Sequence, residues 1–174
     1  MNAIAPLISL EQFRNFFGDQ KPHYEYWDGE ARQKSMPTKL HAKLQRILAT
    51  LFHELGFYSF TELTLHIGLN WEPIPDVTAT IEDFPGPYPT SGINIVIEIL
   101  SLQDTFTTVE EKCERYAEHG ISDILVFDPA ERKLWKWDSS LTSLVRVLEP
   151  TVVLTSRNAM LHITQVWSRM DSER

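Results

Sequence analysis

Two carboxylates and one lysine occupy positions from which their side chains could meet in the folded chain. Asp76 begins an apolar segment just after a proline, Glu98 interrupts a run of β-branched residues, and Lys112 lies in a helical pattern. An ionised carboxylate among apolar residues is costly to desolvate, so we expect Glu98 to face a cation, a hydrogen-bond network or a metal ion. Two acids and an ammonium suit phosphodiester hydrolysis, in which the acids hold Mg²⁺ or Mn²⁺ and the lysine stabilises or orients the attacking species.

The spacing along the chain allows these three side chains to converge. Twenty-two positions separate Asp76 from Glu98, which allows two neighbouring strands joined by the proline-rich loop 82–91. Fourteen positions separate Glu98 from Lys112. This length is enough for the strand to end, for the chain to turn, and for two turns of a helix to pack back over the strand. Scattered surface charges would give the same spacing, so spacing by itself does not decide between the two explanations.

A shared metal ion has a consequence for the metal-free protein. If Asp76 and Glu98 bind one ion, their negative charges lie close together when that ion is absent. Like charges at short distance destabilise the folded state. We therefore expect Asp76→Asn to raise the melting temperature of the metal-free protein.

Hydrophobic periodicity indicates the elements that would position this site. Residues 93–100 alternate between an isoleucine face and a face of mixed residues, as a buried strand does. Residues 105–119 form a helical pattern in which Lys112 lies beside Tyr116 at the border of the apolar face. Residues 122–127 are again apolar, so the order strand, helix, strand predicts a parallel crossover.

The remaining elements follow from turn and capping signals. Ser9 and Gln12 have the spacing of a capping box, and Asp28-Gly29 is a dipeptide that type I′ hairpin turns favour. Residues 69–74 indicate a connection. The other predicted elements are a helix over 9–18, a hairpin around Asp28-Gly29, a helix that opens at Pro37 and runs to Leu55, strands over 58–67 and 75–81, an outer hairpin of 133–137 and 143–148, and a terminal helix over 163–170.

The predicted helix over 37–55 has an apolar face and a basic stripe. Leu40 belongs to the apolar face, whereas Lys39, Lys43 and Arg46 line up elsewhere at intervals of about one turn. The stripe is either a solvated surface or a set of nucleic-acid phosphate contacts.

Three other side chains are candidates for an auxiliary role at the site. Glu25 alternates with aromatic neighbours in the predicted hairpin and is either a solvated strand carboxylate or a site residue. His41 flanks the apolar face of its helix and is either a packing residue or an auxiliary group. Tyr116 is the close neighbour of Lys112 on its helix.

Composition bounds the class of protein. With 43% hydrophobic and 23% charged residues, the 174-residue chain is expected to form one domain over residues 1–174. The single cysteine, Cys113, excludes an internal disulfide, and no paired Cys/His spacing suggests a zinc site. Without a leader pattern or a run of ~18 apolar residues, we expect a soluble, cytoplasmic protein with no membrane contact. A net charge of -8 means that any nucleic-acid contact must use a local patch.

A set of short motifs covers most of the chain. They are Tyr24-Glu25, Asp28-Gly29, a helix opening with Pro37 and His41, Pro75-Asp76-Val77, Glu98-Ile-Leu-Ser101, Lys112 with Tyr116 and Gly120, and Asp128-Pro129. At these residues the sequence resembles the Uma-two group of restriction-endonuclease-like proteins, a branch of the PD-(D/E)xK nuclease superfamily. The resemblance implies an α/β (α+β) fold with a mixed β-sheet flanked by helices. It also implies that Asp76 and Glu98 are metal ligands and that Lys112 is the catalytic lysine, displaced onto a helix.

The sequence departs from the family pattern at two positions. Thr108 stands four residues before Lys112, where the family often has an acid, and Leu102 replaces a common proline. Leu100 occupies the position where the superfamily's usual lysine would follow the acid, and the migrated Lys112 supplies that charge instead. The triad itself is complete.

Two classes of function stay open from the sequence. The first is a Mg²⁺-dependent endodeoxyribonuclease that acts on DNA, expected as a homodimer because two related sites most simply cut two antiparallel strands. The second is a non-catalytic nucleic-acid-binding or assembly module that retains the nuclease fold. The triad favours the first, whereas net acidity and Thr108 favour the second. A serine or cysteine hydrolase is not indicated, because there is no nucleophile elbow and Cys113 lies on a packing face.

Overall fold

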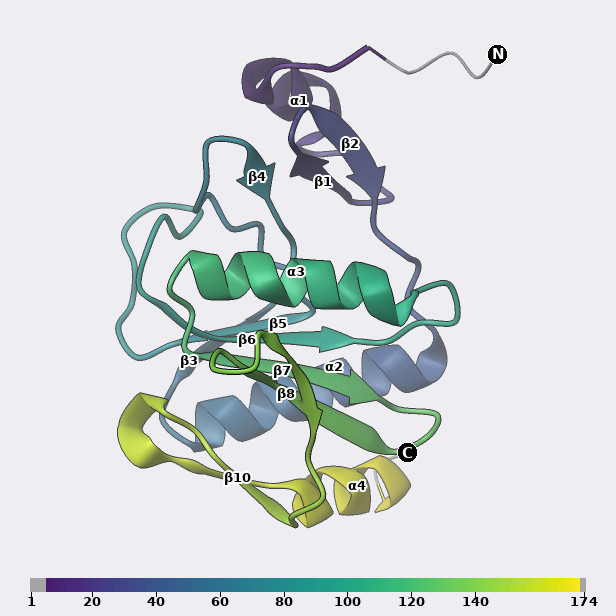
Figure 1. Cartoon of the computed structure of the whole chain (residues 1–174), viewed down its shortest axis with the longest axis vertical. Helices are drawn as coiled ribbons and strands as arrows, with labels where there is room; N and C mark the ends of the chain where they lie inside the picture. Colours follow the sequence, from purple (N-terminus) through teal and green to yellow (C-terminus); the bar gives the residue numbers. More distant parts are fainter. Residues whose placement is uncertain (1–5, 173–174) are drawn as a thin grey trace.

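A six-stranded mixed sheet lies at the centre of the fold (Figure 1). The computed structural model describes residues 6–172. In the strand order β3-β5-β6-β7-β8-β9, β6 and β7 run parallel and the other neighbours antiparallel. The strands are β3 (Tyr58–Thr61), β5 (Val77–Thr80), β6 (Ile93–Ile99), β7 (Asp123–Asp128), β8 (Lys133–Asp138) and β9 (Ser143–Arg146). The expected α/β (α+β) architecture is confirmed.

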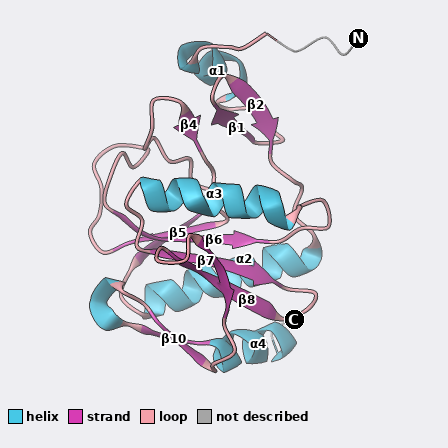
Figure 2. Ribbon diagram, in the orientation of Figure 1, coloured by secondary structure: helices cyan, strands magenta, loops and turns pink. Residues whose placement is uncertain are grey.

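Helices cover both faces of this sheet, as Figure 2 shows. On one face, α2 (Lys39–Glu54) and α4 (Ile163–Ser172) bury leucines and isoleucines against alternate residues of β5 and β6. On the other face, α3 (Phe106–Glu118) buries Val109 and Tyr116. Among residues 6–172, no helix is both long and apolar enough to cross a membrane.

The amino-terminal segment adds a small sheet, with the strand order β2-β1-β4, and one helix beside α3 (Figure 1). Its elements are α1 (Leu10–Phe17), β1 (Tyr24–Trp27), β2 (Glu30–Gln33) and β4 (Trp71–Glu72). Ser9 and Gln12 form both hydrogen bonds of the capping box that the sequence predicts. Asp28 and Gly29 have φ values of 49° and 97°, which confirms a hairpin turn with two left-handed residues.

The crossover from β6 through α3 to β7 is present as predicted. Ile95 opposes Asp123 in parallel register. Thr105 caps α3 by accepting the backbone N–H of Thr108, and Gly120, with φ 79°, follows the end of the helix. The crossover therefore carries α3 back over the carboxyl end of β6.

β6 departs from the expected alternation at its first residue. Ile95 packs toward α2, but Ile93 packs toward α3. The cause is an irregularity in the pairing with β5, where Thr80 opposes Ile93 and Ala79 opposes Ile95. Asn94 is the extra residue between them, and such a bulge turns the preceding side chain to the other face.

The start of α2 also differs from the prediction. Thr38 is its N-cap and accepts the backbone N–H of His41, so Pro37 lies just outside the helix rather than in its first turn. Leu40, expected on the apolar face, is 47% exposed. The first turn projects beyond the sheet, so its apolar pattern is not used for burial.

Two strand predictions need correction. The strand expected over 58–67 ends at Thr61, because Glu62 has φ 52° and leaves the extended conformation. The connection expected over 69–74 contains β4, which pairs with β1.

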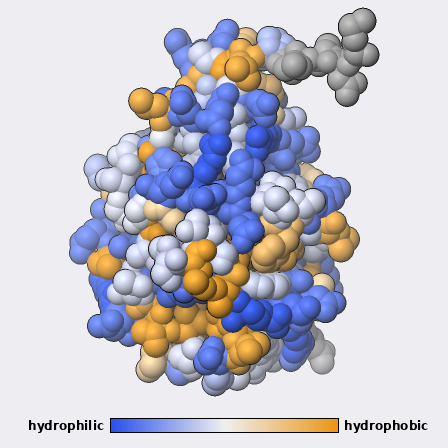
Figure 3. Space-filling model, in the orientation of Figure 1, coloured by the Kyte–Doolittle hydropathy of each residue, from blue (hydrophilic) through white to orange (hydrophobic). Residues whose placement is uncertain are grey.

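A short ribbon near the carboxyl end was not predicted. It consists of β10 (Thr151–Val153), the 3₁₀ turn η1 (Ser156–Asn158) and β11 (Met160–His162). Strands of three residues carry too little alternation to be recognised. Val153 and Met160 oppose each other on the ribbon and are both exposed, and Figure 3 shows hydrophobic surface in this part of the molecule.

Asp123 joins the segment after β10 to the central sheet, and its replacement should destabilise the fold. Its buried carboxylate accepts hydrogen bonds from Lys136 Nζ (2.9 Å) and from the backbone N–H groups of Thr155 and Ser156 (both 3.0 Å). Burial alone would raise the pKa of Asp123, but these donors outweigh it and lower the pKa. Asp123→Asn should cost about 1–3 kcal/mol of unfolding free energy at pH 7, because an amide accepts from fewer donors.

The cost of Asp123→Asn should shrink in acid. A carboxylate whose folded-state pKa is lowered contributes stability above its unfolded pKa and loses it as the pH falls through the folded value. Urea unfolding of the parent and the variant at pH 7 and pH 3 measures both effects, with Glu114→Gln as an exposed-acid control. An equal loss at both pH values would contradict the role given to the carboxylate.

Candidate active site

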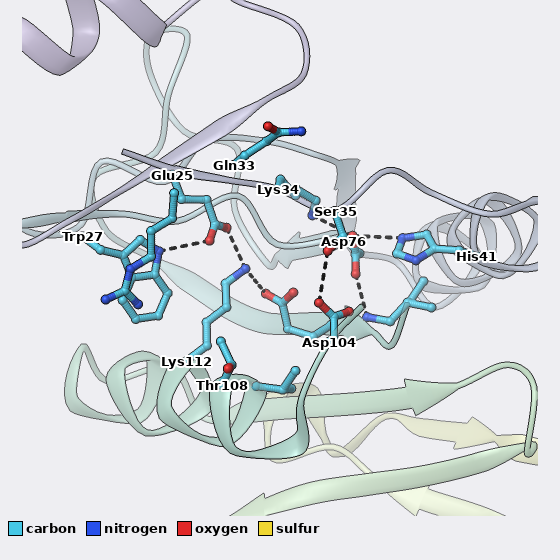
Figure 4. Close-up of a pocket in the computed structure, with 14 residues that line it drawn as sticks. Glu25, Trp27, Gln33, Lys34, Ser35, His41, Asp76, Asp104, Thr108 and Lys112 are labelled. Carbon is cyan, nitrogen blue, oxygen red and sulfur yellow. Dashed lines mark hydrogen bonds and ion pairs between the residues drawn. The ribbon is translucent and has the colours of Figure 1, made fainter. Parts of the chain in front are cut away.

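A pocket of about 200 Å³ lies where the start of β5, the end of β6, α3 and the β1–β2 hairpin meet (Figure 4). The structure brings Asp76, Glu98 and Lys112 together there. The ionisable residues that build its centre are Glu25, Lys34, His41, Asp76, Glu98 and Lys112.

Strand pairing places the two expected metal ligands side by side. Val77 opposes Ile97 in the antiparallel ladder of β5 and β6. Asp76 and Glu98 are therefore the next positions at the same end of both strands. Opposed residues of an antiparallel pair point to the same side of the sheet, so both carboxylates reach the pocket.

Asp76 is held by three groups from three different elements. Its Oδ1 lies 2.6 Å from Lys34 Nζ and 3.1 Å from His41 Nε2, and its Oδ2 accepts the backbone N–H of Ile99 at 2.6 Å. Burial alone would raise the pKa of Asp76, but the Lys34 ammonium and the His41 contact outweigh it and lower the pKa. Asp76 is therefore ionised and compensated in this structure.

Lys112 lies between two buried carboxylates. Its Nζ is 2.6 Å from Glu25 Oε1 and 2.9 Å from Glu98 Oε1. Burial works against the ammonium, yet the charges of Glu25 and Glu98 raise the pKa of Lys112. Glu25 is 7% exposed and also accepts the Trp27 indole N–H and the Ile74 backbone N–H. The interpretation of Glu25 as a solvated strand carboxylate is wrong, and Glu25 is a pocket residue.

Glu98 combines burial with two donors. Its Oε1 accepts the Tyr116 hydroxyl at 2.7 Å and contacts Lys112. Burial raises the pKa of Glu98 to about 6, against the opposing charge of Lys112. Burial, followed by the charge of Glu98, also raises the pKa of Tyr116, so the phenol keeps its proton and acts as the donor.

His41 faces the pocket with unused hydrogen-bonding capacity. Its ring is buried, and neither ring nitrogen forms a hydrogen bond of good geometry with another described residue. The contact of Nε2 with Asp76 is an ion-pair distance only. A buried ring nitrogen without a partner is costly, so Nδ1, which has none among the described residues, leaves His41 with a polar atom that can meet a ligand.

The basic stripe does not lie in the pocket. Lys43 donates to the backbone carbonyl of Met170 in α4 at 2.6 Å, so its ammonium joins two helices. Lys39 lines a neighbouring groove with Leu102 and Asp104. Arg46 lies on the exposed surface of α2. The three cations therefore have different surroundings despite their regular spacing.

Lys34 is a pocket residue that sequence reasoning missed, and it contacts one of the expected metal ligands. It follows β2 directly, donates to the Ile74 carbonyl at 2.7 Å, and contacts Asp76 at 2.6 Å. The hairpin turn at Asp28-Gly29 fixed the position of Lys34 along β2. No sequence signal indicated that the hairpin would pack over the start of β5.

These contacts reverse the expectation of repulsion at Asp76. Its nearest charged partners are Lys34 and, when protonated, His41, rather than an unscreened Glu98. Removing its charge would leave the Lys34 ammonium without a carboxylate. Asp76→Asn is therefore expected to destabilise the metal-free protein instead of stabilising it.

The donor chemistry of Asp76 and Glu98 fits a divalent ion. Carboxylate oxygens are the ligands that Mg²⁺ and Mn²⁺ prefer, and these two come from adjacent strand ends. Within residues 6–172, no group of three or more His, Cys, Asp or Glu side chains is arranged to hold a metal ion. In this structure the two carboxylates are instead compensated by Lys34 and Lys112.

The chain belongs to the Uma2 (Uma-two) family, described as "Putative restriction endonuclease", whose profile matches residues 10–164. The resemblance inferred from the sequence is confirmed.

A solved structure supports the fold. The chain is similar to a "putative nuclease belonging to DUF820" from Anabaena variabilis ATCC 29413, with a TM-score of 0.76 and 21% identity over 94% of this chain and 99% of that chain. This level of identity shows the fold alone. A match to DrdV in a DNA complex has 13% identity over 75% of this chain and 11% of that chain. Its TM-score of 0.39 is too low to indicate a shared fold. No curated protein matches the sequence significantly.

Asp76→Asn tests the ion pairs at the start of β5. The variant should lose on the order of 3 kcal/mol of unfolding free energy in the presence of a chelator, because a buried ammonium loses its partner. Urea unfolding of parent and variant in EDTA measures the loss. A variant as stable as the parent would show that Lys34 and His41 do not hold Asp76 in solution.

Glu98→Gln tests the raised pKa of Glu98. Because the folded state binds this proton more tightly than the unfolded state, the parent should lose stability as the pH rises from 4.5 to about 6. A rise of this size corresponds to about 2 kcal/mol. The stability of Glu98→Gln relative to the parent should therefore increase by up to that amount between a pH well below 4.5 and a pH well above 6. Urea unfolding at several pH values in EDTA measures it, and a difference independent of pH would contradict it.

Proposed function

We propose that this protein is a metal-dependent endonuclease that hydrolyses DNA phosphodiester bonds. The observation that carries the proposal is the convergence of Asp76, Glu98 and Lys112 in one pocket. Membership of the Uma2 family supports the nuclease class. The cofactor we propose is Mg²⁺, with Mn²⁺ as the alternative ion.

The pocket residues have separate roles in this proposal. Asp76 and Glu98 would hold the ion, which polarises the phosphate and lowers the pKa of a bound water. The Lys112 ammonium stabilises negative charge that develops on the phosphate oxygens, or orients the attacking water. Its raised pKa keeps it charged, so it acts as a cation rather than as a general base.

Other groups fix these residues in position. Glu25 holds the Lys112 ammonium, and the Trp27 indole N–H holds Glu25 through its second oxygen. The Tyr116 hydroxyl orients Glu98. His41 lies beside Asp76 at the edge of the site, with its Nε2 3.1 Å from Asp76 Oδ1. Groups held in this way need little rearrangement when charge develops in the transition state.

A second candidate function is a non-catalytic nucleic-acid-binding or assembly module. One observation favours it: Lys34 and Lys112 already compensate both expected metal ligands. A site built only for stability would have the same ion pairs. Metal-dependent cleavage separates the two candidates, because a module of this kind would bind without cutting.

DNA is the proposed partner, and Lys39 is the cation best placed to contact its phosphates. Lys39 is exposed at the first turn of α2, beside the groove that adjoins the pocket. The Lys43 ammonium already donates to the backbone carbonyl of Met170 in α4. The overall charge of -8 makes such a local contact necessary. A homodimer stays a prediction.

Cleavage of supercoiled plasmid and of single-stranded DNA tests the proposed activity. The parent should nick or cut DNA with Mg²⁺ or Mn²⁺ and not with EDTA. Glu98→Gln should lose at least about a hundredfold in rate, since one charged group at the site is removed. The matched control is Glu114→Gln, an exposed acid on α3, which should keep the parent's rate. Cleavage by Glu98→Gln at the parent's rate would reject the site, and binding without cleavage would favour the module.

Lys112 is a poorer choice than Glu98 for that cleavage test. It is 8% exposed and neutralises two carboxylates, so its truncation would leave Glu25 and Glu98 buried without a counter-charge. Such a variant would lose stability together with activity.

Salt dependence of DNA affinity tests the assignment of Lys39. Replacing a lysine that contacts phosphate lowers the slope of log affinity against log salt by about one. Lys39→Ala should show this change, whereas Lys43→Ala should leave the slope unaltered because its ammonium is bound to Met170. Titrations of labelled DNA at several salt concentrations measure the slopes. Equal slopes for the parent and Lys39→Ala would show that Lys39 is a solvated surface residue and does not contact phosphate.

A further inference from the structure

We propose that the Lys34 ammonium occupies the position beside Asp76 where a divalent ion would bind. Lys34 must then be displaced before such an ion can bind there. The inference rests on the proposed function, because it assigns a control of metal binding to the same site. Lys34 would then set how much free metal ion the protein requires.

The contacts of Asp76 point to this role. Its Oδ2 is committed to the backbone N–H of Ile99. Its Oδ1 has no backbone donor, and Lys34 Nζ lies 2.6 Å and His41 Nε2 3.1 Å from it. An ammonium and a divalent ion repel each other at such short range, so both cannot use Oδ1 together.

Lys34 differs from Lys112 in how firmly it is held. Lys112 contacts two carboxylates, Glu25 and Glu98, and its withdrawal would leave both without a cation. Lys34 contacts one carboxylate and the neutral carbonyl of Ile74. A metal ion at Asp76 would replace the charge that Lys34 removes, so the exchange leaves no buried carboxylate uncompensated.

The surroundings of Lys34 offer a second position for its ammonium. Lys34 lines both the pocket and an outer groove of about 410 Å³, which Lys21 and Glu62 also line. The backbone of Lys34 is fixed, because its N–H donates to the His23 carbonyl at 2.8 Å. Rotation of the side chain alone can therefore carry the charge from Asp76 toward the groove. A side chain with two alternative positions, one at Asp76 and one in the outer groove, forms a simple two-state switch.

A hydrogen bond beside Lys34 ties its segment to the loop after β6. The Ser35 hydroxyl donates to Asp104 Oδ1 at 3.2 Å, and Asp104 Oδ2 accepts the backbone N–H of Ser101. Figure 4 shows this hydrogen bond as the dashed line between Ser35 and Asp104. The segment that carries Lys34 is thus anchored on both sides, and the exchange is confined to the side chain.

Mn²⁺ binding in the absence of DNA tests the inference directly. The variant Lys34→Met retains an apolar stem of similar length and removes the charge, and Lys34→Gln serves as a second neutral variant if the first fails to fold. Lys133→Met, which removes a lysine outside the pocket, is the matched control. Free Mn²⁺ is measured by electron paramagnetic resonance during titration of each folded protein, with circular dichroism as the check of folding.

The Lys34 variant should bind Mn²⁺ about tenfold more tightly or better, because a neighbouring positive charge lowers the proton affinity of a carboxylate by one to three factors of ten and repels a divalent ion in the same way. Lys133→Met should bind as the parent does. Equal or weaker Mn²⁺ binding by a folded Lys34 variant would overturn the inference.

Plasmid cleavage by the same preparations separates this inference from the proposed function. Tighter Mn²⁺ binding by the Lys34 variant without cleavage by any protein would support the role of Lys34 and reject the nuclease. Cleavage by the parent, together with unchanged Mn²⁺ affinity in the Lys34 variant, would support the nuclease and reject the role of Lys34.

Discussion

The pocket depends on one buried ion network, in which Lys112 joins Glu25 and Glu98. The two contacts, at 2.6 Å and 2.9 Å, connect α3 to the amino-terminal hairpin and to the end of β6. A buried ammonium without counter-charges costs several kcal/mol, so these three elements must meet for the chain to fold with Lys112 inside. The same requirement places the hairpin over the sheet, and with it Lys34 over Asp76.

The charge balance of this network explains why the pocket is suited to a cation. Three buried carboxylates, Glu25, Asp76 and Glu98, face the ammonium groups of Lys34 and Lys112, which leaves one negative charge when His41 is neutral. Glu98 absorbs part of this excess, since burial raises its pKa to about 6. A site with such an excess gains by taking up a proton or a metal ion.

The hydrophobic pattern and the local turn signals were enough to predict most elements around the site. The capping box at Ser9, the Asp28-Gly29 turn and the crossover from β6 through α3 to β7 all follow from contacts within about thirty residues, which the sequence order itself brings together. For the same reason Asp76, Glu98 and Lys112 could be expected to converge. Family membership could likewise be recognised from motifs that follow one another along the chain.

Tertiary structure alone decided which charges meet. Glu25 and Lys112 are 87 positions apart, and Lys34 and Asp76 are 42 apart. No periodicity predicts such pairs, because they arise from the packing of the hairpin against the sheet rather than from either segment. Packing also divided the regular stripe on α2 into a helix-joining Lys43 and an exposed Lys39. The sequence by itself determined the fold class and the acid–lysine triad, whereas the burial of Glu25, the counter-charge on Asp76 and the surroundings of each cation required long-range contacts.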